Sequence, residues 1–183
     1  VTVLTGVGAG VGGMGLALLL HLIQHLAYGY SLDAVISAES FLQGVSDASP
    51  LRRVLVLTGC GALAGGGWWA LYRYGRPLVA IKQAVQSPGQ PMPLPETSIH
   101  VLLQIVTVAL GSPLGREVPP REIGAAVAGW LSRRAGLTIE ESRILIACGA
   151  GAGLAAVYNV PLAGALFVHE VLLGSFSLSA VLP

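Results

Sequence analysis

Long stretches without charged side chains constrain this chain more than any other feature. Asp33 is the only Asp, Glu, Lys or Arg among the first 38 residues, and residues 54–72, 97–115 and 144–169 contain none of these four types. A helix that crosses a bilayer needs about 20 predominantly apolar residues. The pattern therefore predicts an all-α, polytopic transmembrane protein, with three or four segments long enough to span the membrane.

The composition argues against several other classes of protein. Hydrophobic residues make up 54% of the chain and charged residues only 10%, whereas a soluble domain carries about 25% charged residues. Disordered chains are poor in apolar residues, and a formal net charge of +1 with scattered cations gives no basic patch for a nucleic acid. We expect neither an enzyme nor a cofactor or metal, because the sequence shows no Ser-His-Asp grouping, paired-carboxylate pattern or complete metal-ligand set.

The two ends and the two cysteines suggest how the chain is organised. It begins at Val1 and stops within an apolar stretch, so we expect residues 1–183 to be a single transmembrane domain fragment of a longer protein. Cys60 and Cys148 lie in apolar, glycine-rich runs. We interpret them as small packing residues rather than a disulfide or a metal site.

The hydrophobic pattern predicts a series of helices of unequal length. A capping box, with Thr138 as N-cap and Glu141 three residues later, is expected to open one of them. Short apolar helices interrupted by Gly and Pro are typical of broken helices around a site at the membrane midplane, which makes the break at 111–120 the most informative place. Residues 31–50 are expected to form a loop, and the predicted helices cover 1–30, 51–74, 78–86, 97–111, 118–134, 138–157, 161–173 and a segment that starts near Ser177.

The basic residues indicate an orientation in the membrane. Lys and Arg favour cytoplasmic loops, and two of them, Arg52 and Arg53, precede one spanning segment. A larger group is expected on the other, cytoplasmic side, and consists of Arg73, Arg76, Lys82, Arg133, Arg134 and Arg143.

Glycines near the N-terminus match a dinucleotide-binding pattern by spacing. Gly8, Gly10 and Gly13 fit G-x-G-x-x-G, and Asp33 follows 20 residues after the last of them. The next helix is apolar nearly all round and no strand–helix alternation follows, which favours close helix packing through small residues instead. We interpret the pairs Gly61/Gly65 and Gly149/Gly153 in the same way.

Histidines occur at two places in the apolar segments. His21 and His25 lie four residues apart, on one face of a helix, but no third metal ligand is near them. His169 and Glu170 are expected at membrane depth. Ionisable residues at this depth usually have a functional role. A hydrogen bond between helices is an equally good interpretation of these two residues.

The segment Gly115-Arg116-Glu117 places a guanidinium and a carboxylate at the start of a helix in otherwise apolar sequence. Helix N-termini present unpaired backbone N–H groups and a partial positive charge, which together bind anions. The Glu117 carboxylate can occupy such a site until protonation or a competing anion displaces it, which permits a gate. The alternative is an Arg116–Glu117 pair that only ties loops together.

Two motifs carry a resemblance to a known family. Residues 115–124 read GREVPPREIG and residues 149–170 read GAGAGLAAVYNVPLAGALFVHE. They resemble, in order and spacing, the G-R-E-G-P and G-A-A-A-G-L-A-A-A-F-N-A-P-L-A-G motifs of the CLC family of chloride channels and chloride/proton antiporters. The resemblance is strong from residue 111 to 173 and weaker before that.

The resemblance implies a fold, a site and a partner. The chain would be the first of two inverted-topology halves of a homodimeric protein, integral to a lipid bilayer and expected in a bacterial inner membrane. Glu117 would be the external gate, and Gly115 and Arg116 would line the anion path. Chloride would be the transported ion rather than a cofactor.

Three departures from the family pattern affect the expected mechanism. A serine that contacts the central anion is matched here by Tyr74, followed by Gly75. Val118 replaces a glycine after the gate and Pro120 adds a second proline. The internal proton-accepting glutamate of the antiporters is matched by Val171, as in channels of the family, so we expect passive, channel-like conduction; His169 and Glu170 form an alternative proton path.

Other functions are kept as alternatives. They are chloride/proton exchange, transport of another anion such as fluoride or nitrate, and a membrane scaffold that retains the fold without transport. The altered position Tyr74 motivates the last two.

Overall fold

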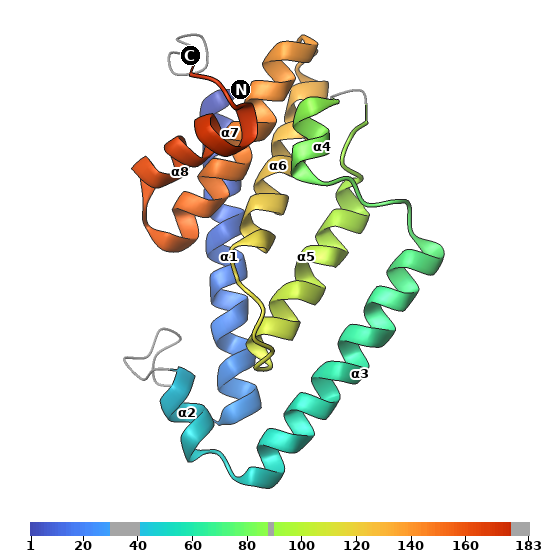
Figure 1. Ribbon diagram of the computed structural model, residues 1–183, viewed down its shortest axis with the longest axis vertical. Helices are drawn as coiled ribbons and strands as arrows, with labels where there is room; N and C mark the ends of the chain where they lie inside the picture. The colour runs from blue at the N-terminus through green and yellow to red at the C-terminus, as the bar shows by residue number, and fades with distance from the viewer. Residues whose placement is uncertain (30–40, 88–89, 177–183) are drawn as a thin grey trace.

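Helices form all the regular structure in the described part of the chain, which comprises residues 1–29, 41–87 and 90–176 of a computed structural model (Figure 1). This confirms the predicted all-α class. The helices are α1 (Thr2–Tyr28), α2 (Phe41–Asp47), α3 (Pro50–Tyr74), α4 (Ile81–Gln86), α5 (Leu94–Ala109), α6 (Val118–Arg134), α7 (Ile139–Tyr158) and α8 (Pro161–Phe167), which continues into the π-helical turn η1 (Val168–Leu173).

Most predicted helices are present, with differences at their ends. Residues 41–47 form α2 where the sequence predicts a loop, and helix α5 begins at Leu94, three residues early, because Pro95 is tolerated in a first turn. The capping box is confirmed, with the Glu141 backbone N–H donating to Thr138 Oγ1 and the Thr138 N–H to Glu141 Oε2. The rest of the predicted loop, residues 31–40, and the helix predicted near Ser177 lie outside the described residues.

Within the part of the chain that the structure describes, two helices are long and apolar enough to cross a membrane, namely α1 and α3. The charge-free stretch 144–169 does not form a third, because the backbone turns at Asn159. Asn159 ends α7 in the left-handed conformation, with φ at 54°, and asparagine is one of the few residues that tolerate it. The prediction of three or four spanning segments is therefore too high for single unbroken helices.

The long and short helices occupy different parts of the molecule (Figure 1). Helix α1 runs along most of its length, α3 occupies the lower half at one edge and α5 the middle, whereas α6, α7 and α8 fill only the upper part. After α5 the chain climbs back to the middle of the molecule before α6 begins, so the break at 111–117 ends at mid-height. The end of α6, the start of α7 and α4 lie at the upper end, away from the start of α3, which carries Arg52 and Arg53.

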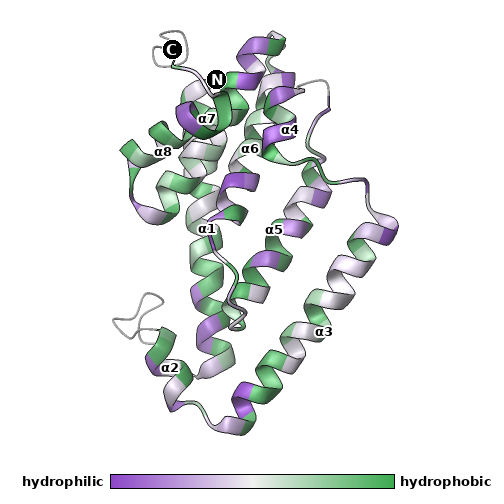
Figure 2. Ribbon diagram, in the orientation of Figure 1, coloured by the Kyte–Doolittle hydropathy of each residue, from purple (hydrophilic) through white to green (hydrophobic). Residues whose placement is uncertain are grey.

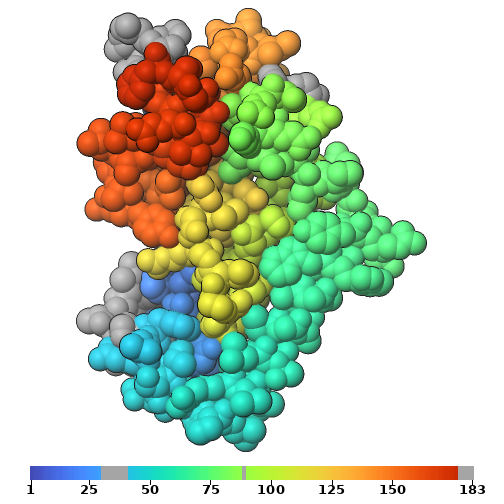
Figure 3. All heavy atoms as spheres, viewed as in Figure 1, coloured from blue at the N-terminus to red at the C-terminus, as the bar shows by residue number. Residues whose placement is uncertain are grey.

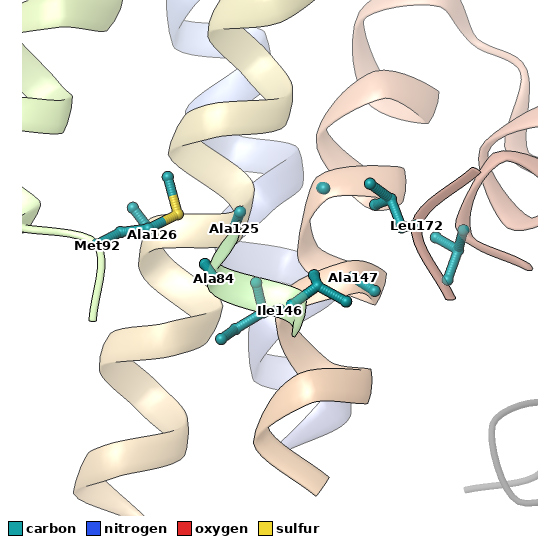
Figure 4. Packing of buried hydrophobic residues seen from close by; sticks show 10 residues of the cluster. Ala84, Met92, Ala125, Ala126, Ile146, Ala147 and Leu172 are labelled. Carbon is teal, nitrogen blue, oxygen red and sulfur yellow. The ribbon is translucent and has the colours of Figure 1, made fainter. Parts of the chain in front are cut away.

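Backbone-to-backbone contacts hold the short helices together. A Cβ on Gly124 would collide with the carbonyl oxygen of Gly149, and a Cβ on Gly153 with that of Pro120. Gly151 and Gly164 meet in the same way between α7 and α8. Alanines and a few larger side chains fill the space beside these contacts (Figure 4). The glycine pair predicted in α7 is confirmed as a close-packing motif.

The other predicted glycine motifs behave differently from one another. Gly8 and Gly13 of α1 lie against Val127 of α6 and Ala156 of α7, at 3.2 and 3.3 Å from a Cβ position, whereas Gly10 has open space around it. Gly61 and Gly65 of α3 also face open space. The packing interpretation is therefore wrong for these last two positions within this chain, where the close approach of α3 to α5 is made by Gly67 against Leu103.

Helix α3 stands at the edge of the molecule and exposes much of its apolar surface (Figures 1 and 3). It packs mainly on α5, and Cys60 Sγ lies 3.6 Å from the carbonyl oxygen of Thr107. Figure 2 shows that most of the helix is hydrophobic or neutral between its polar ends. Such a surface suits hydrocarbon rather than water. The exposed apolar side chains are Leu51, Val54, Leu55, Leu57, Leu63 and Trp69.

An ion pair joins the end of α3 to the start of α5. Arg76 Nε and Nη2 donate to the two carboxylate oxygens of Glu96 at 2.9 and 3.0 Å. These hydrogen bonds lower the pKa of Glu96 to about 2. A carboxyl whose pKa is lowered by folding stabilises the folded state above its unfolded pKa, and loses that contribution as the pH falls towards the folded value.

We expect Gly149→Ala to destabilise the protein by about 1–3 kcal/mol, because its methyl group would overpack the contact with Gly124. Gly61→Ala is the matched control, since open space surrounds that glycine and alanine favours a helix over glycine by about 1 kcal/mol. Denaturant unfolding in detergent measures both. Equal stability of the two variants would contradict the packing assigned to Gly149.

Glu96→Gln is expected to reduce the loss of folding stability at acidic pH. The wild-type protein should lose stability as the pH falls from about 4.5 to about 2, where Glu96 becomes protonated and releases Arg76. The variant lacks this titration and should lose less over the same range. Thermal melting against pH, with Glu140→Gln as control for an exposed carboxylate, tests the assignment. The same loss of stability at acidic pH in the Glu96 and Glu140 variants would refute it.

Candidate functional site

The break before α6 is held at its start by a hydrogen bond from Tyr28. Tyr28 Oη donates a hydrogen bond of 2.8 Å to the carbonyl oxygen of Leu110, where α5 ends. Gly111 follows with φ at 99°, a conformation that favours glycine, and a Cβ there would press on the same Tyr28 hydroxyl. The chain can therefore leave α5 sharply and return to mid-height, with residues 113–116 exposed.

Glu117 is the N-cap residue of α6, which agrees with its predicted place at the start of a helix. Its carboxylate does not cap that helix, and its own backbone is helical, with φ and ψ at −81° and −24°. The side chain turns back onto Gly115, where a Cβ would collide with both carboxylate oxygens. The glycine thus leaves room for this position of the carboxylate.

The start of α6 has fewer hydrogen-bond donors than an ordinary helix. An α-helix leaves its first four backbone N–H groups unpaired, but Pro119 and Pro120 occupy the second and third positions here and have none. Both prolines are buried. Val118 is therefore the first-turn residue of the helix that still carries a backbone N–H, with Arg121 following the prolines.

Arg121 braces this N-terminus. Its Nε donates to the carbonyl oxygen of Glu117 at 3.0 Å, and its guanidinium lies 5.3 Å from the centre of the Phe167 ring in α8. The side chain therefore connects the N-cap to the end of α8. Arg121 was not among the predicted site residues, although it lies four residues after Glu117 in the sequence.

Arg116 turns towards the end of α7. Its guanidinium lies 5.5 Å from the centre of the Tyr158 ring, a distance typical of a cation–π contact. This partner differs from the Arg116–Glu117 pair considered as an alternative. Arg116 also borders a small cavity of about 70 Å³, which is lined by Leu16, Ala17, Leu20, His21, Ile105, Arg116, Pro120 and Val157.

His21 thus lies beside the anion motif, on the same small cavity as Arg116. Within the described ranges, no group of three His, Cys, Asp or Glu side chains is placed to hold a metal ion. The sequence showed only the pairing of His21 with His25 on one helix face. The contact of α1 with the start of α6 is tertiary, which is why sequence spacing gave no sign of it.

Tyr74 and Gly75 are not brought to this site within the chain. They end α3 at the outer edge of the molecule, on the far side of α5 from the start of α6 (Figure 1). Tyr74 is 75% exposed and its ring contacts Trp69 and the Arg73 guanidinium. Their role in binding an anion remains a prediction.

His169 and Glu170 lie in η1 but face different surroundings. His169 is buried, with Nδ1 3.3 Å from the carbonyl oxygen of Ser175 and its ring stacked on Phe176 at 4.3 Å. Glu170 is exposed, as is the apolar Val171 that follows. His169 also borders an open cavity of about 570 Å³ between α1, α7 and α8. The proton path assigned to this pair remains a prediction.

Known proteins match the chain over the same motifs. The sequence profile described as voltage gated chloride channel matches residues 60–183. The chain is 34% identical over 149 residues to proteins named voltage-gated ClC-type chloride channel ClcB from Citrobacter koseri, Escherichia coli O139:H28 and Shigella boydii serotype 18. Each match covers 79% of this chain and 35% of the relative.

The matches cover most of this chain but only part of each relative. The chain spans about a third of the length of the curated relatives, as the 35% coverage states. No solved structure gives a significant match. The profile covers both motifs and more than half of the chain, and the chain therefore belongs to the voltage gated chloride channel family.

Proposed function

We propose that the full-length protein transports a small anion, chloride in the first instance, across a membrane and that Glu117 gates the path. One observation supports this most directly. The Glu117 carboxylate stands at the mid-height N-terminus of α6, folded onto Gly115 without a cap hydrogen bond. A free carboxylate at a helix N-terminus competes with an external anion for the same partial positive charge.

Protonation of Glu117 opens the path in this mechanism. A neutral carboxyl no longer repels an approaching anion, so flux rises as the pH falls. Gly115 supplies the space into which the side chain folds. Arg121 keeps the N-cap carbonyl in place while the carboxylate moves.

The proposed transport is channel-like rather than strictly coupled to protons. The residue after Glu170 is Val171, whose exposed apolar side chain cannot accept a proton. In the antiporters that the motifs resemble, this position holds a glutamate. Uncoupled conduction is therefore favoured over chloride/proton exchange.

The setting of the transport path is part of the same proposal. We assign residues 1–183 to one transmembrane domain that forms part of the pore, with the remaining walls supplied by the rest of the full-length protein. The bacterial relatives support an inner-membrane location, and the family resemblance supports a homodimer. The exposed apolar surface of α3 fits contact with lipid.

Glu117→Gln is expected to remove most of the rise in chloride flux at acidic pH, because the amide does not titrate. Chloride efflux and proton movement are measured in liposomes that contain the full-length protein, with Glu140→Gln as the control. A wild-type pH dependence retained in Glu117→Gln would refute the gate. Stoichiometric proton movement would favour chloride/proton exchange. Fluoride flux without chloride flux would indicate a fluoride transporter, and the absence of any flux would favour a membrane scaffold.

Pro120→Ala is expected to strengthen anion binding at the start of α6, because it restores a backbone N–H in the first turn. A hydrogen bond to a charged group contributes about 1.5–3 kcal/mol, so chloride affinity should rise about tenfold or more. Calorimetric titration of the full-length protein measures it. Pro95→Ala, which restores an N–H in the first turn of α5, is the matched control. Unchanged affinity in a folded Pro120→Ala protein would place the anion elsewhere.

A further inference from the structure

Three polar side chains meet between α5 and α6, away from the anion motif. His100 Nδ1 lies 2.8 Å from Glu122 Oε2, and Gln104 Nε2 lies 3.1 Å from the same oxygen. Gln104 Nε2 is also 3.0 Å from His100 Nδ1. The side chains of His100 and Glu122 are only 18% and 16% exposed. Figure 2 shows hydrophilic positions inside α5 and near the start of α6.

This geometry requires a proton between the imidazole and the carboxyl group. If Nδ1 and Oε2 were both unprotonated, two lone pairs would face each other at 2.8 Å. The neutral imidazole meets this requirement when its single proton is on Nδ1, and the imidazolium adds a positive charge to the same Nδ1–H hydrogen bond to the carboxylate. Gln104 Nε2 donates to the same carboxylate oxygen.

The charged side chains nearest to His100 and Glu122 along α5 and α6 are paired with other residues. The Trp68 ring of α3 lies edge-on to His100 at 6.2 Å. Glu96, one turn earlier on α5, is held by Arg76. Arg121, next to Glu122 on α6, turns instead towards Glu117 and Phe167. The cation paired with Glu122 in the described part of the chain is therefore His100.

We propose that His100, Gln104 and Glu122 form a proton-binding site that fastens α6 to α5. The fastening is strongest when His100 is an imidazolium and Glu122 is ionised. Loss of a proton leaves a neutral Nδ1–H as the donor to the carboxylate, and gain of a proton neutralises the carboxylate. Either change removes one of the two charges that strengthen the hydrogen bond. His100 and Glu122 come from different helices, so each change in protonation acts on the α5–α6 contact.

The site gives transport a second dependence on pH. Glu122 follows Glu117 by five residues on the same helix, so a weaker α5–α6 contact displaces the proposed gate. This last link rests on the proposed function. The proton site itself does not, because it is defined by contacts that are independent of transport.

A double-mutant cycle tests the site in the full-length protein. The variants are His100→Gln, Glu122→Gln and their combination, and unfolding in detergent is measured from about pH 4 to pH 8, the range in which carboxyl and imidazole groups ordinarily titrate. We expect a coupling of about tenfold in the unfolding equilibrium constant near pH 5–6, the size of a charge-assisted hydrogen bond. The coupling should shrink towards both ends of the range. Coupling that is absent, or constant with pH, would overturn the proposal.

A spectroscopic measurement covers the case in which a His100 variant does not fold. Residues 1–183 contain four histidines, and the imidazole nitrogens of the full-length protein are followed against pH by NMR in the wild-type and Glu122→Gln proteins. One imidazole is expected to change its response to pH while the others keep theirs. Unchanged responses of all imidazoles would overturn the proposal.

Flux measurements separate this inference from the gate. In the Glu117→Gln background, His100→Gln/Glu122→Gln is expected to remove whatever pH dependence of chloride flux remains. If Glu117→Gln leaves transport unaltered while the coupling is present, the gate fails and the proton site stands. If the coupling is absent while Glu117→Gln abolishes the pH dependence, the proton site fails and the gate stands.

Discussion

Direct backbone contact between α6, α7 and α8 is the constraint on which the rest of the structure depends. Gly124 meets Gly149, and Gly153 meets the carbonyl of Pro120, so no side chain separates the helices at these points. Helices packed so closely have little freedom to slide, because interiors at this density resist displacement. The start of α6 and the end of α7 are thereby fixed together at mid-height, with Arg116 against Tyr158.

The same close packing buries the two prolines in the first turn of α6, and these prolines reduce the number of N–H groups available to bind an anion there. Pro119 and Pro120 are buried against neighbouring elements and fix the first turn of α6. They also remove two of the N–H groups that would otherwise hold an anion. At the proposed site an anion would be held by few donors, and a binding free energy of about 3–4 kcal/mol would correspond to a dissociation constant of about 1–10 mM. Weak binding suits conduction, because the ion must also leave.

Local sequence signals were sufficient for most of the helices and for the position of Glu117, but they missed α2 and the surroundings of Glu117. The capping box at Thr138 and the prolines after Glu117 act within one turn, so their spacing is visible in the sequence. The meeting of His21 with Arg116, and of His100 with Glu122, depends on helix packing, which no local pattern encodes. Gly61 and Gly65 have the spacing of a packing motif but face open space, because the partner of a small-residue pair is not specified by the pair itself.

Two arginines and one carboxylate set the charge at the start of α6. Arg116 lies against the Tyr158 ring, and Arg121 lies against the Phe167 ring and the Glu117 carbonyl. Both guanidinium groups keep their positive charge in these contacts, which hold them beside the partial positive charge of the helix terminus. In the proposed mechanism this positive charge attracts an anion, and the Glu117 carboxylate opposes its entry until the carboxylate is protonated. A single protonation event would then change the path from closed to open.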